Sequence, residues 1–219
     1  MLPGPCNAVS ATSYNYGPLA DTYTNKSDGV ISTFDTGQAK VLLNTTANSA
    51  LRVVSGKLTN IETGAIAAAG YQYANLGQNV TRIGGSFILS QVSGSPTLNG
   101  AAVFLVMNNF MPTTTSLTTA CHFVISKTGW LLQYVISGVF TTYASGSLSL
   151  AYETPYTAQA LLDSVSGKAT LFLPDGTTQV VSNAVLTSGP GPGQYACFEV
   201  FASNASSDDK AKFINVFAS

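Results

Sequence analysis

Alternation of apolar and polar residues is the feature that most constrains the fold of this chain. From about Lys40 to the C-terminus, short β-branched runs with a period of two residues are separated by Gly, Asn and Ser. Side chains alternate between the two faces of a strand, so this period indicates half-buried strands, and no helical periodicity competes with it. The sequence therefore predicts an all-β protein, with strands at Val41–Asn44, Leu51–Val54, Ala65–Asn75, Val80–Gln91, Ala101–Met107, His122–Ser126, Trp130–Ile136, Ala158–Val165, Lys168–Leu173, Thr177–Val181, Tyr195–Ala202 and Phe213–Ala218.

Turn signals join several of these strands into hairpins. In the segment Pro174-Asp175-Gly176, proline presets a turn, aspartate tolerates left-handed backbone and glycine adopts a positive φ. Ser166-Gly167 makes a similar turn upstream, so we expect three consecutive antiparallel strands here. The total exceeds what one open sheet carries comfortably. We therefore expect two packed antiparallel sheets in a jelly-roll sandwich.

The first eighteen residues differ from the rest of the chain. They contain three prolines and two glycines and lack alternation, so we expect an extended N-terminal arm at residues 1–18 and one sandwich domain at residues 19–219. Proline cannot donate to a central ladder, which suits a segment that lies across a neighbouring subunit. Tyr14 and Tyr16, on one side of an extended chain, are the expected assembly-arm anchors. A frayed terminus is the alternative.

Charged residues are scarce. They make up 9% of the 219 residues, against about 25% in typical soluble domains, and the net charge is -1. A basic patch for nucleic acid is therefore not expected, and 45% hydrophobic residues argue against disorder. Apolar runs of about seven residues are too short for a spanning helix of ~20, so no membrane insertion is expected. Met1–Pro18 has no Lys or Arg and no long apolar stretch, so no secretory signal is expected.

Three cysteines, Cys6, Cys121 and Cys197, form no CxxC pair. This odd count argues against a disulfide framework and a zinc site, so we expect reduced structural thiols. The alternative is a disulfide between Cys121 and Cys197 on neighbouring strands.

Short motifs near the start of the chain resemble a known family. Asp21-Thr-Tyr-Thr, Thr36-Gly37-Gln38 and Ser55-Gly56-Lys57-Leu58 are similar to the opening of concanavalin A-like (laminin G-like) jelly-roll domains in tail-associated proteins of phages that infect actinobacteria. In that family an acidic-x-aromatic first strand precedes a Gly-Gln element and a strand that begins at a Gly-x-Leu step. The family's usual Trp soon after the Gly-Gln element is absent here.

The resemblance covers roughly residues 20 to 219. The run from His122 to Leu132 resembles the paired central strands, and the run from Lys168 to Gly176 resembles the late hairpin. The segment Phe213–Ser219 is similar to the family's closing strand, which returns to pair near the first. The resemblance thus implies a concanavalin A-like sandwich in a virion protein.

Catalytic patterns are weak in this sequence. Glucan-cleaving enzymes of this fold carry an E-x-D-x-x-E strand, which is absent here. Glu153 and Glu199 could still meet in space as the carboxyl pair, about 5 Å apart, that retaining hydrolysis requires. We expect instead that Glu199 lies on a strand face in solvent or beside Lys or Arg. His122, the single histidine, has no nucleophile elbow, and its neighbour Cys121 points to the opposite face, so a structural or surface role is expected and no catalytic residue is assigned.

Two kinds of binding site remain to be weighed. The resemblance implies a calcium ion in the rim loops, and its conceivable ligands are Asp21, Asp28, Asp208 and Asn204. Because the sequence has no Asp-x-Asp ladder, we expect no metal and no cofactor. Alternation places Trp130, Leu132 and Tyr134 on one face, which we expect to pack in the core rather than form a lectin platform. Aromatic residues on which sugars could stack are Trp130, Tyr134, Tyr143, Tyr152, Tyr156 and Tyr195.

The low charge guides the functional interpretation. A surface of Ser, Thr, Asn and Gly can be buried against another subunit at little cost, whereas each unpaired charge buried in such an interface costs several kcal/mol. The sequence and its resemblance favour a non-enzymatic phage virion structural protein, a minor tail or capsid-decorating subunit that is assembled in the bacterial host cytoplasm. Its expected partners are copies of itself, other virion subunits and host surface glycans. A secreted or surface carbohydrate-binding module is the first alternative, and a glycoside hydrolase with an atypical site is the second.

Overall fold

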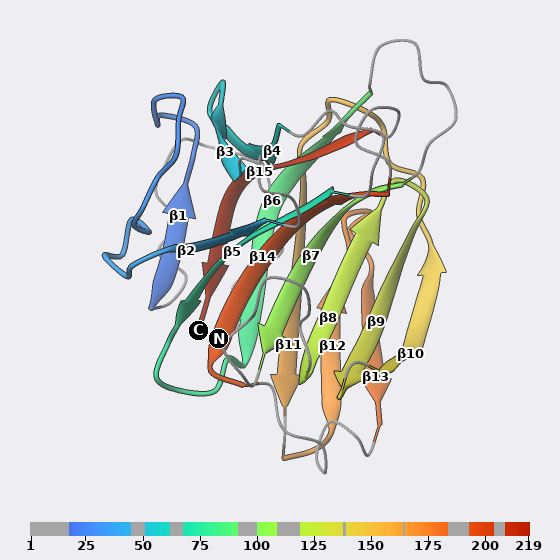
Figure 1. Cartoon of the computed structure of the whole chain (residues 1–219). Helices are drawn as coiled ribbons and strands as arrows, with labels where there is room; N and C mark the ends of the chain where they lie inside the picture. The colour runs from blue at the N-terminus through green and yellow to red at the C-terminus, as the bar shows by residue number, and fades with distance from the viewer. Residues whose placement is uncertain are drawn as a thin grey trace.

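Two antiparallel β-sheets face one another in the computed structural model of the protein (Figure 1). The structure describes residues 18–44, 51–61, 68–91, 100–108, 119–137, 139–163, 165–183, 193–203 and 209–219. Regular structure in these segments is strand throughout, and the all-β prediction is confirmed. Within the same segments, no helix has the length and apolar character needed to cross a membrane.

The first sheet has eight strands and contains both the first and the last strand of the chain. β1 (Leu19–Thr22) pairs with the last strand, β15, so the closing strand returns to the first as the resemblance implied. The order of the others is β13 (Thr178–Ser182), β12 (Lys168–Phe172), β11 (Tyr156–Asp163), β6 (Arg82–Ser90), β15 (Lys210–Ala218), β4 (Lys57–Asn60) and β3 (Leu51–Val54).

The second sheet has seven strands and forms the nearer layer in Figure 1. Its centre is made by strands that are distant in the sequence, because β14 lies between β7 and β5. The order is β10 (Val139–Ser147), β9 (Gly129–Ile136), β8 (Thr119–Ser126), β7 (Ala101–Asn108), β14 (Tyr195–Ala202), β5 (Ala68–Asn75) and β2 (Val41–Asn44).

The predicted hairpins are confirmed. β11, β12 and β13 are consecutive antiparallel strands. Gly176 has a φ of 85° and Gly167 a φ of 67°, as their turns require. The Leu173 carbonyl oxygen accepts a hydrogen bond from the Gly176 N–H at 3.0 Å, which closes the turn between β12 and β13.

The core lies between the two sheets and is built from the inward side of each strand. Trp130, Leu132 and Tyr134 of β9 are all buried there, so the expectation that this face packs in the core is confirmed. Phe198 of β14 packs edge-to-face on Phe213 of β15, with ring centroids 6.3 Å apart, and joins the two layers.

β6 and β15 lie unusually close together at Gly85, which has no side chain to keep them apart. Gly85 is paired with Val216, next to an irregularity in β15 between Phe213 and Asn215. A methyl group at Gly85 would lie 2.6 Å from the backbone carbonyl oxygen of Asn215. Backbone cannot move aside as a flexible side chain can, so this position requires glycine.

Replacing Gly85 with Ala is therefore expected to destabilise the sandwich by about 1–3 kcal/mol. For a domain of this size each kcal/mol lowers Tm by roughly 2–4 °C, which a thermal unfolding scan resolves. The matched control is Ser182→Ala at an exposed position of β13, where the change should stay within about 0.5 kcal/mol. Equal melting of the two variants would contradict the close approach.

Candidate functional site

The outward side of the seven-stranded sheet is apolar, where a solvated sheet face would be polar. On β14, Ala196, Phe198 and Val200 point into the core, so the residues between them point away from it. Residues paired with these on β5, β7 and β8 share the same side. Phe140 of β10 belongs to the same side, because its ring contacts that of His122. We call this set of residues the outer face: Tyr71, Tyr73, Phe104, Val106, Ala120, His122, Phe140, Tyr195, Cys197, Glu199 and Phe201.

Aromatic rings cross the outer face from β10 to β14, and we call Phe140, His122, Phe104 and Phe201 the aromatic row. Ring centroids are 5.9 Å apart between Phe140 and His122. They are 6.0 Å apart between His122 and Phe104, and 5.8 Å apart between Phe104 and Phe201. All three contacts are edge-to-face, an arrangement that ring quadrupoles favour.

The aromatic row is accessible in part. Phe140 is 59% exposed on the edge strand β10, and Phe104 and Phe201 are half-buried. These three rings are therefore open to solvent in part, whereas His122, the fourth ring of the row, is buried.

Glu199 lies in the middle of the outer face, paired with Tyr71 on one side and Phe104 on the other. It is only 6% exposed, and burial raises the pKa of its carboxyl to about 8. Within the described residues no cation contacts it. The prediction that Glu199 lies in solvent or beside Lys or Arg is wrong, because its neighbours on both sides are aromatic.

His122 lies on β8 and is 3% exposed. Neither Nδ1 nor Nε2 has a hydrogen-bond partner among the described residues. Burial lowers the pKa of the imidazole to about 4, so the ring is neutral at pH 7. A buried polar group without a partner costs about 1–3 kcal/mol, so the His122 side chain lowers the stability of the fold, as the Gln72 and Ser90 atoms that are unpaired in the described structure also do.

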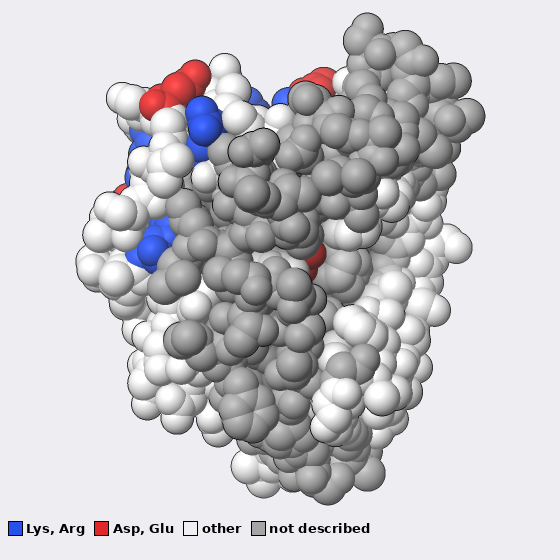
Figure 2. All heavy atoms as spheres, in the orientation of Figure 1, with Lys and Arg blue, Asp and Glu red and all other residues white. Residues whose placement is uncertain are grey.

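The outer face carries almost no charge. The seven strands of this sheet contain no Lys, Arg or Asp, and Glu199 is their one carboxylic acid. Figure 2 shows charged side chains on the left of the view, over the side of β1 to β4, at its upper edge and at one acidic spot near the centre, whereas the described surface on the right, over β8 to β10, is uncharged. The site is therefore aromatic and neutral.

The structure does not bring Glu153 and Glu199 together. Glu153 is exposed, and its N–H donates to the carbonyl oxygen of Leu89 at the end of β6, in the other sheet. Glu199 points away from that sheet. The described residues thus offer no close carboxyl pair of the kind that retaining hydrolysis requires.

Asp21 does not fit a calcium site. It is fully buried in β1 and forms ion pairs with both Lys26 and Lys40. Lys26 also pairs with Asp35 at 2.9 Å. A carboxylate that two lysines already neutralise is a poor cation ligand.

The other calcium candidates gain no support. Asp28 accepts a hydrogen bond from the Ser55 N–H at 2.7 Å. Asp208 and Asn204 lie outside the described residues. Within the described part of the chain, no three His, Cys, Asp or Glu side chains gather in a way that could hold a metal ion.

Cys121 and Cys197 are free and buried. Cys121 faces the core and Cys197 belongs to the outer face, and β7 lies between their strands. The alternative of a disulfide between them is therefore wrong. Burial raises the pKa of the Cys121 thiol to about 12, so it is unreactive. Cys6 lies outside the described residues.

The aromatic candidates from the sequence divide between core and surface. Trp130 and Tyr134 are in the core. Tyr195 alone of the six candidates lies on the outer face, where its ring packs on Tyr73 with centroids 6.1 Å apart. Tyr143, Tyr152 and Tyr156 are partly buried against the core. The expected arm anchors Tyr14 and Tyr16 lie outside the described residues.

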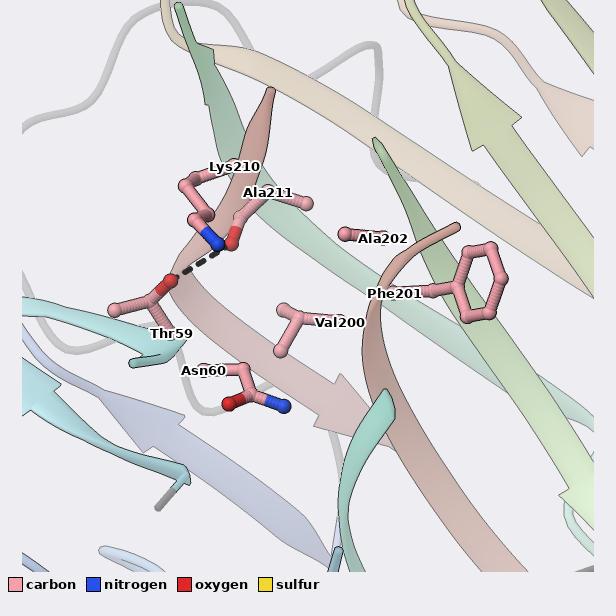
Figure 3. A pocket seen from close by; sticks show the side chains of 7 residues that line it. All are labelled: Thr59, Asn60, Val200, Phe201, Ala202, Lys210 and Ala211. Carbon is pink, nitrogen blue, oxygen red and sulfur yellow. Dashed lines mark hydrogen bonds between the residues drawn. The ribbon is translucent and has the colours of Figure 1, made fainter. Parts of the chain in front are cut away.

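A small hollow lies between β4, β14 and β15 (Figure 3). It measures about 220 Å³ with the space open to solvent included, below the ~300–1,000 Å³ of typical ligand pockets. The Thr59 hydroxyl on its wall already donates to the Ala211 carbonyl oxygen at 3.1 Å. Phe201 lines both this hollow and the outer face. We therefore place the candidate site on the outer face.

Comparison with known proteins shows the fold. No known family matches the sequence, and no curated protein is similar to it at the sequence level. The carbohydrate-binding module CBM66 from Bacillus subtilis is similar in structure, with a TM-score of 0.54 and 10% identity over 81% of this chain and 94% of that chain. Lectin UEA-II, solved with galactose, has a TM-score of 0.58 and 10% identity over 92% of this chain and 98% of that chain.

Peanut lectin, solved with a nine-residue peptide, is a third similar structure. It has a TM-score of 0.58 and 8% identity over 91% of this chain and 96% of that chain. The chain thus has the two-sheet jelly-roll fold of concanavalin A-like lectins and carbohydrate-binding modules. The predicted fold is confirmed, whereas no comparison ties the chain to phage tail proteins.

Proposed function

We propose that this protein is a carbohydrate-binding module that holds a glycan on the outer face of its seven-stranded sheet. The observation that carries the proposal is the aromatic row, which crosses an outward sheet face with three of its four rings, Phe140, Phe104 and Phe201, partly open to solvent. Sugar rings present C–H groups that pack on aromatic faces by apolar contact. Phe140 is exposed, and Phe104 and Phe201 are half-buried, so these three rings offer apolar surface to a ligand.

Lectin-like neighbours support this assignment at the level of fold. One is described as a carbohydrate-binding module, and another was solved with galactose. Their identity to this chain is about one residue in ten, so the contacts are argued from this chain's own residues. This function agrees with the first alternative from the sequence rather than with its main interpretation.

We also propose that the module binds glycans without cleaving them. Glu199 lies among aromatic side chains and Glu153 lies at the end of the other sheet, so among the described residues neither has a carboxyl partner for acid and nucleophile roles. Purified protein should release no reducing sugar from a polysaccharide that it binds.

Replacing Phe104 with Ala is expected to weaken glycan binding at least about tenfold, because it removes the centre of the aromatic row. A glycan array identifies the ligand, and isothermal titration calorimetry then measures the change in Kd. The matched control is Phe172→Ala, which removes a half-buried ring from the outward side of the other sheet. Binding by neither wild type nor control, or equal binding by both variants, would refute the assignment.

A virion structural subunit is the second proposal. The small share of charged residues, 9%, supports it, because a neutral surface can be buried against copies of the chain or other subunits without leaving charged groups unpaired. A protein of this kind would be located in the virion. It would form assemblies in a sedimentation experiment and bind nothing on a glycan array, which separates it from the carbohydrate-binding module.

A further inference from the structure

We propose that the protein pairs with a second copy of itself along the edge strand β10, so that the two seven-stranded sheets join into one continuous antiparallel sheet. A two-fold axis relates the two copies. This inference goes beyond the proposed carbohydrate binding and does not depend on it, because backbone groups at the sheet edge make the contact.

β10 is an open edge. Within the described residues it pairs with β9 alone, and seven of its nine residues are exposed. The free side of β1, by contrast, is covered, because the Ala20 N–H donates to Thr36 Oγ1 at 3.1 Å and the Thr22 N–H donates to Asp35 Oδ2 at 2.7 Å. An uncovered edge presents unpaired N–H and C=O groups, so the chemistry of this edge selects another extended strand.

The sequence of β10 does not protect this edge. Natural edge strands commonly carry Lys or Pro, which hinder pairing with another chain. β10 has neither, and β8, β9 and β10 contain no Lys, Arg, Asp or Glu. Its one irregularity lies between Thr142 and Ala144, where the side chain of Tyr143 packs against the core. The stretch Val139–Thr142 therefore keeps regular pairing with β9 while its other side stays open.

Exposed apolar side chains gather at the start of β10. Val139 is 67% exposed and Phe140 59%, and Ile136, which is paired with Val139 at the end of β9, is 41% exposed. A strand placed alongside would remove part of this apolar surface from water, which is favourable by about 25 cal/mol for each Å². The apolar contribution and the backbone hydrogen bonds thus act at the same place.

Hairpin geometry identifies the backbone groups that are open. Ile136 and Val139 are directly paired across a two-residue turn. The pair next to such a turn exchanges both hydrogen bonds, and bonded and open residues then alternate along the strand. Val139 and Thr141 therefore bond to β9. The N–H and C=O groups of Phe140 and Thr142 point away from it.

A second copy of the chain fits these groups. Two strands related by a two-fold axis pair antiparallel, and the register that uses all the open groups matches Phe140 of each copy with Thr142 of the other. Thr141 then lies opposite Thr141 of the second copy, and threonine pairs are favourable cross-strand neighbours. The stretch is uncharged, so the axis brings no like charges together. This complementarity of the strand to itself selects a second copy as the occupant.

Two sheet edges on the same side of the molecule give the contact its area. β10 ends one sheet and β13 ends the other, and both lie at the right of Figure 1. The nine residues of β10 span about 30 Å, and two sheets ~10 Å apart with their outward side chains are about 20 Å thick. Two such walls in contact bury at most about 1,200 Å², which is the lower end for stable interfaces. We therefore expect a dimer of modest affinity.

Sedimentation velocity of the full chain at pH 7, at concentrations up to about 100 μM, measures the association. We expect a closed dimer and no larger species, because a two-fold interface uses the same surface of both copies. Thr141→Lys places two ammonium groups opposite one another and should weaken dimerisation at least about tenfold. Thr141→Val, which is neutral and of the same shape, should keep the dimer. The matched control is Ser27→Lys, which adds the same charge at an exposed position after β1.

Amide hydrogen exchange locates the contact within the same protein. Raising the protein concentration should slow exchange of the Phe140 and Thr142 N–H groups, which bond to the second copy. Exchange at Val139 and Thr141, which already bond to β9, should not change with concentration.

Three outcomes overturn the proposal. A chain that stays monomeric at about 100 μM has no such interface. A dimer that Thr141→Lys leaves intact, or in which exchange at Phe140 and Thr142 is unchanged, forms through another surface. Wild-type assemblies larger than a dimer require an interface that does not close, which contradicts the two-fold pairing. Glycan binding is measured separately on the array, so failure of the dimer leaves the proposed function standing.

Discussion

Replacing Asp21 with Asn is expected to lower the free energy of unfolding at pH 7 by about 3–5 kcal/mol, because the change leaves a buried cation without its counter-charge. Both the Asp21 and the Lys40 side chains are fully buried in the wild type. Lys26 would keep Asp35 at 2.9 Å, so the stranded charge is that of Lys40.

The Asp21 ion pairs also join parts of the fold. Tyr23 lies beside both ammonium groups, each 5.4 Å from its ring centroid, and its hydroxyl accepts a hydrogen bond from Gln72 of β5. Asp21 itself belongs to β1 in the eight-stranded sheet. Loss of this carboxylate would therefore loosen a contact that links the two sheets.

Urea unfolding at pH 7 measures the effect. Asp175→Asn, in the exposed turn before β13, is the matched control and should stay within about 0.5 kcal/mol of the wild type. The double variant Asp21→Asn with Lys40→Met should recover most of the loss, since it removes the stranded cation. If Asp21→Asn alone changed the free energy of unfolding by less than about 1 kcal/mol, the burial of this pair would not matter to stability.

Alternation in the sequence was sufficient to locate most strands. β2, β3 and β14 begin and end at the predicted residues, because a buried face imposes a period of two that turn residues interrupt. β10 was not predicted. It is an edge strand with most residues exposed, so its sequence need not alternate between apolar and polar residues. β1 and β4 were expected only from the resemblance.

The outer face was harder to predict than the fold. The sequences of β7 and β14 are apolar at both alternating positions, the pattern of strands buried on both sides, and this signal could have placed Glu199 away from solvent. The order of strands could not be obtained this way. Tyr71, Phe104 and Glu199 become neighbours only because β14 pairs with both β5 and β7, and these pairings join distant parts of the chain.

Replacing Glu199 with Gln is expected to raise the free energy of unfolding at pH 8 by about 4 kcal/mol relative to the wild type, with little change at pH 4.5. The carboxyl pKa is raised from 4.5 to about 8 in the folded protein by burial alone. Between these values the folded protein binds the proton more tightly than the unfolded chain does, so wild-type stability falls as pH rises. A Gln side chain has no proton to lose and removes this slope.

His122 allows the sign of the Glu199 effect to be checked within the same protein. Its pKa is lowered from 6.5 to about 4, so the unfolded chain holds more protons between these values and stability rises with pH there. The two slopes oppose one another up to pH 6.5. The decline from Glu199 dominates above pH 6.5, until near pH 8 the buried Lys40 ammonium, whose pKa is lowered to about 8, begins to add a rise. Urea titrations in steps of half a pH unit should therefore show the wild type losing stability above pH 6.5 and Glu199→Gln holding level. Glu153→Gln, at an exposed position, should follow the wild type. Parallel curves for wild type and Glu199→Gln would mean that Glu199 is ionised in the folded protein at neutral pH, and that the outer face is wetter than the structure shows.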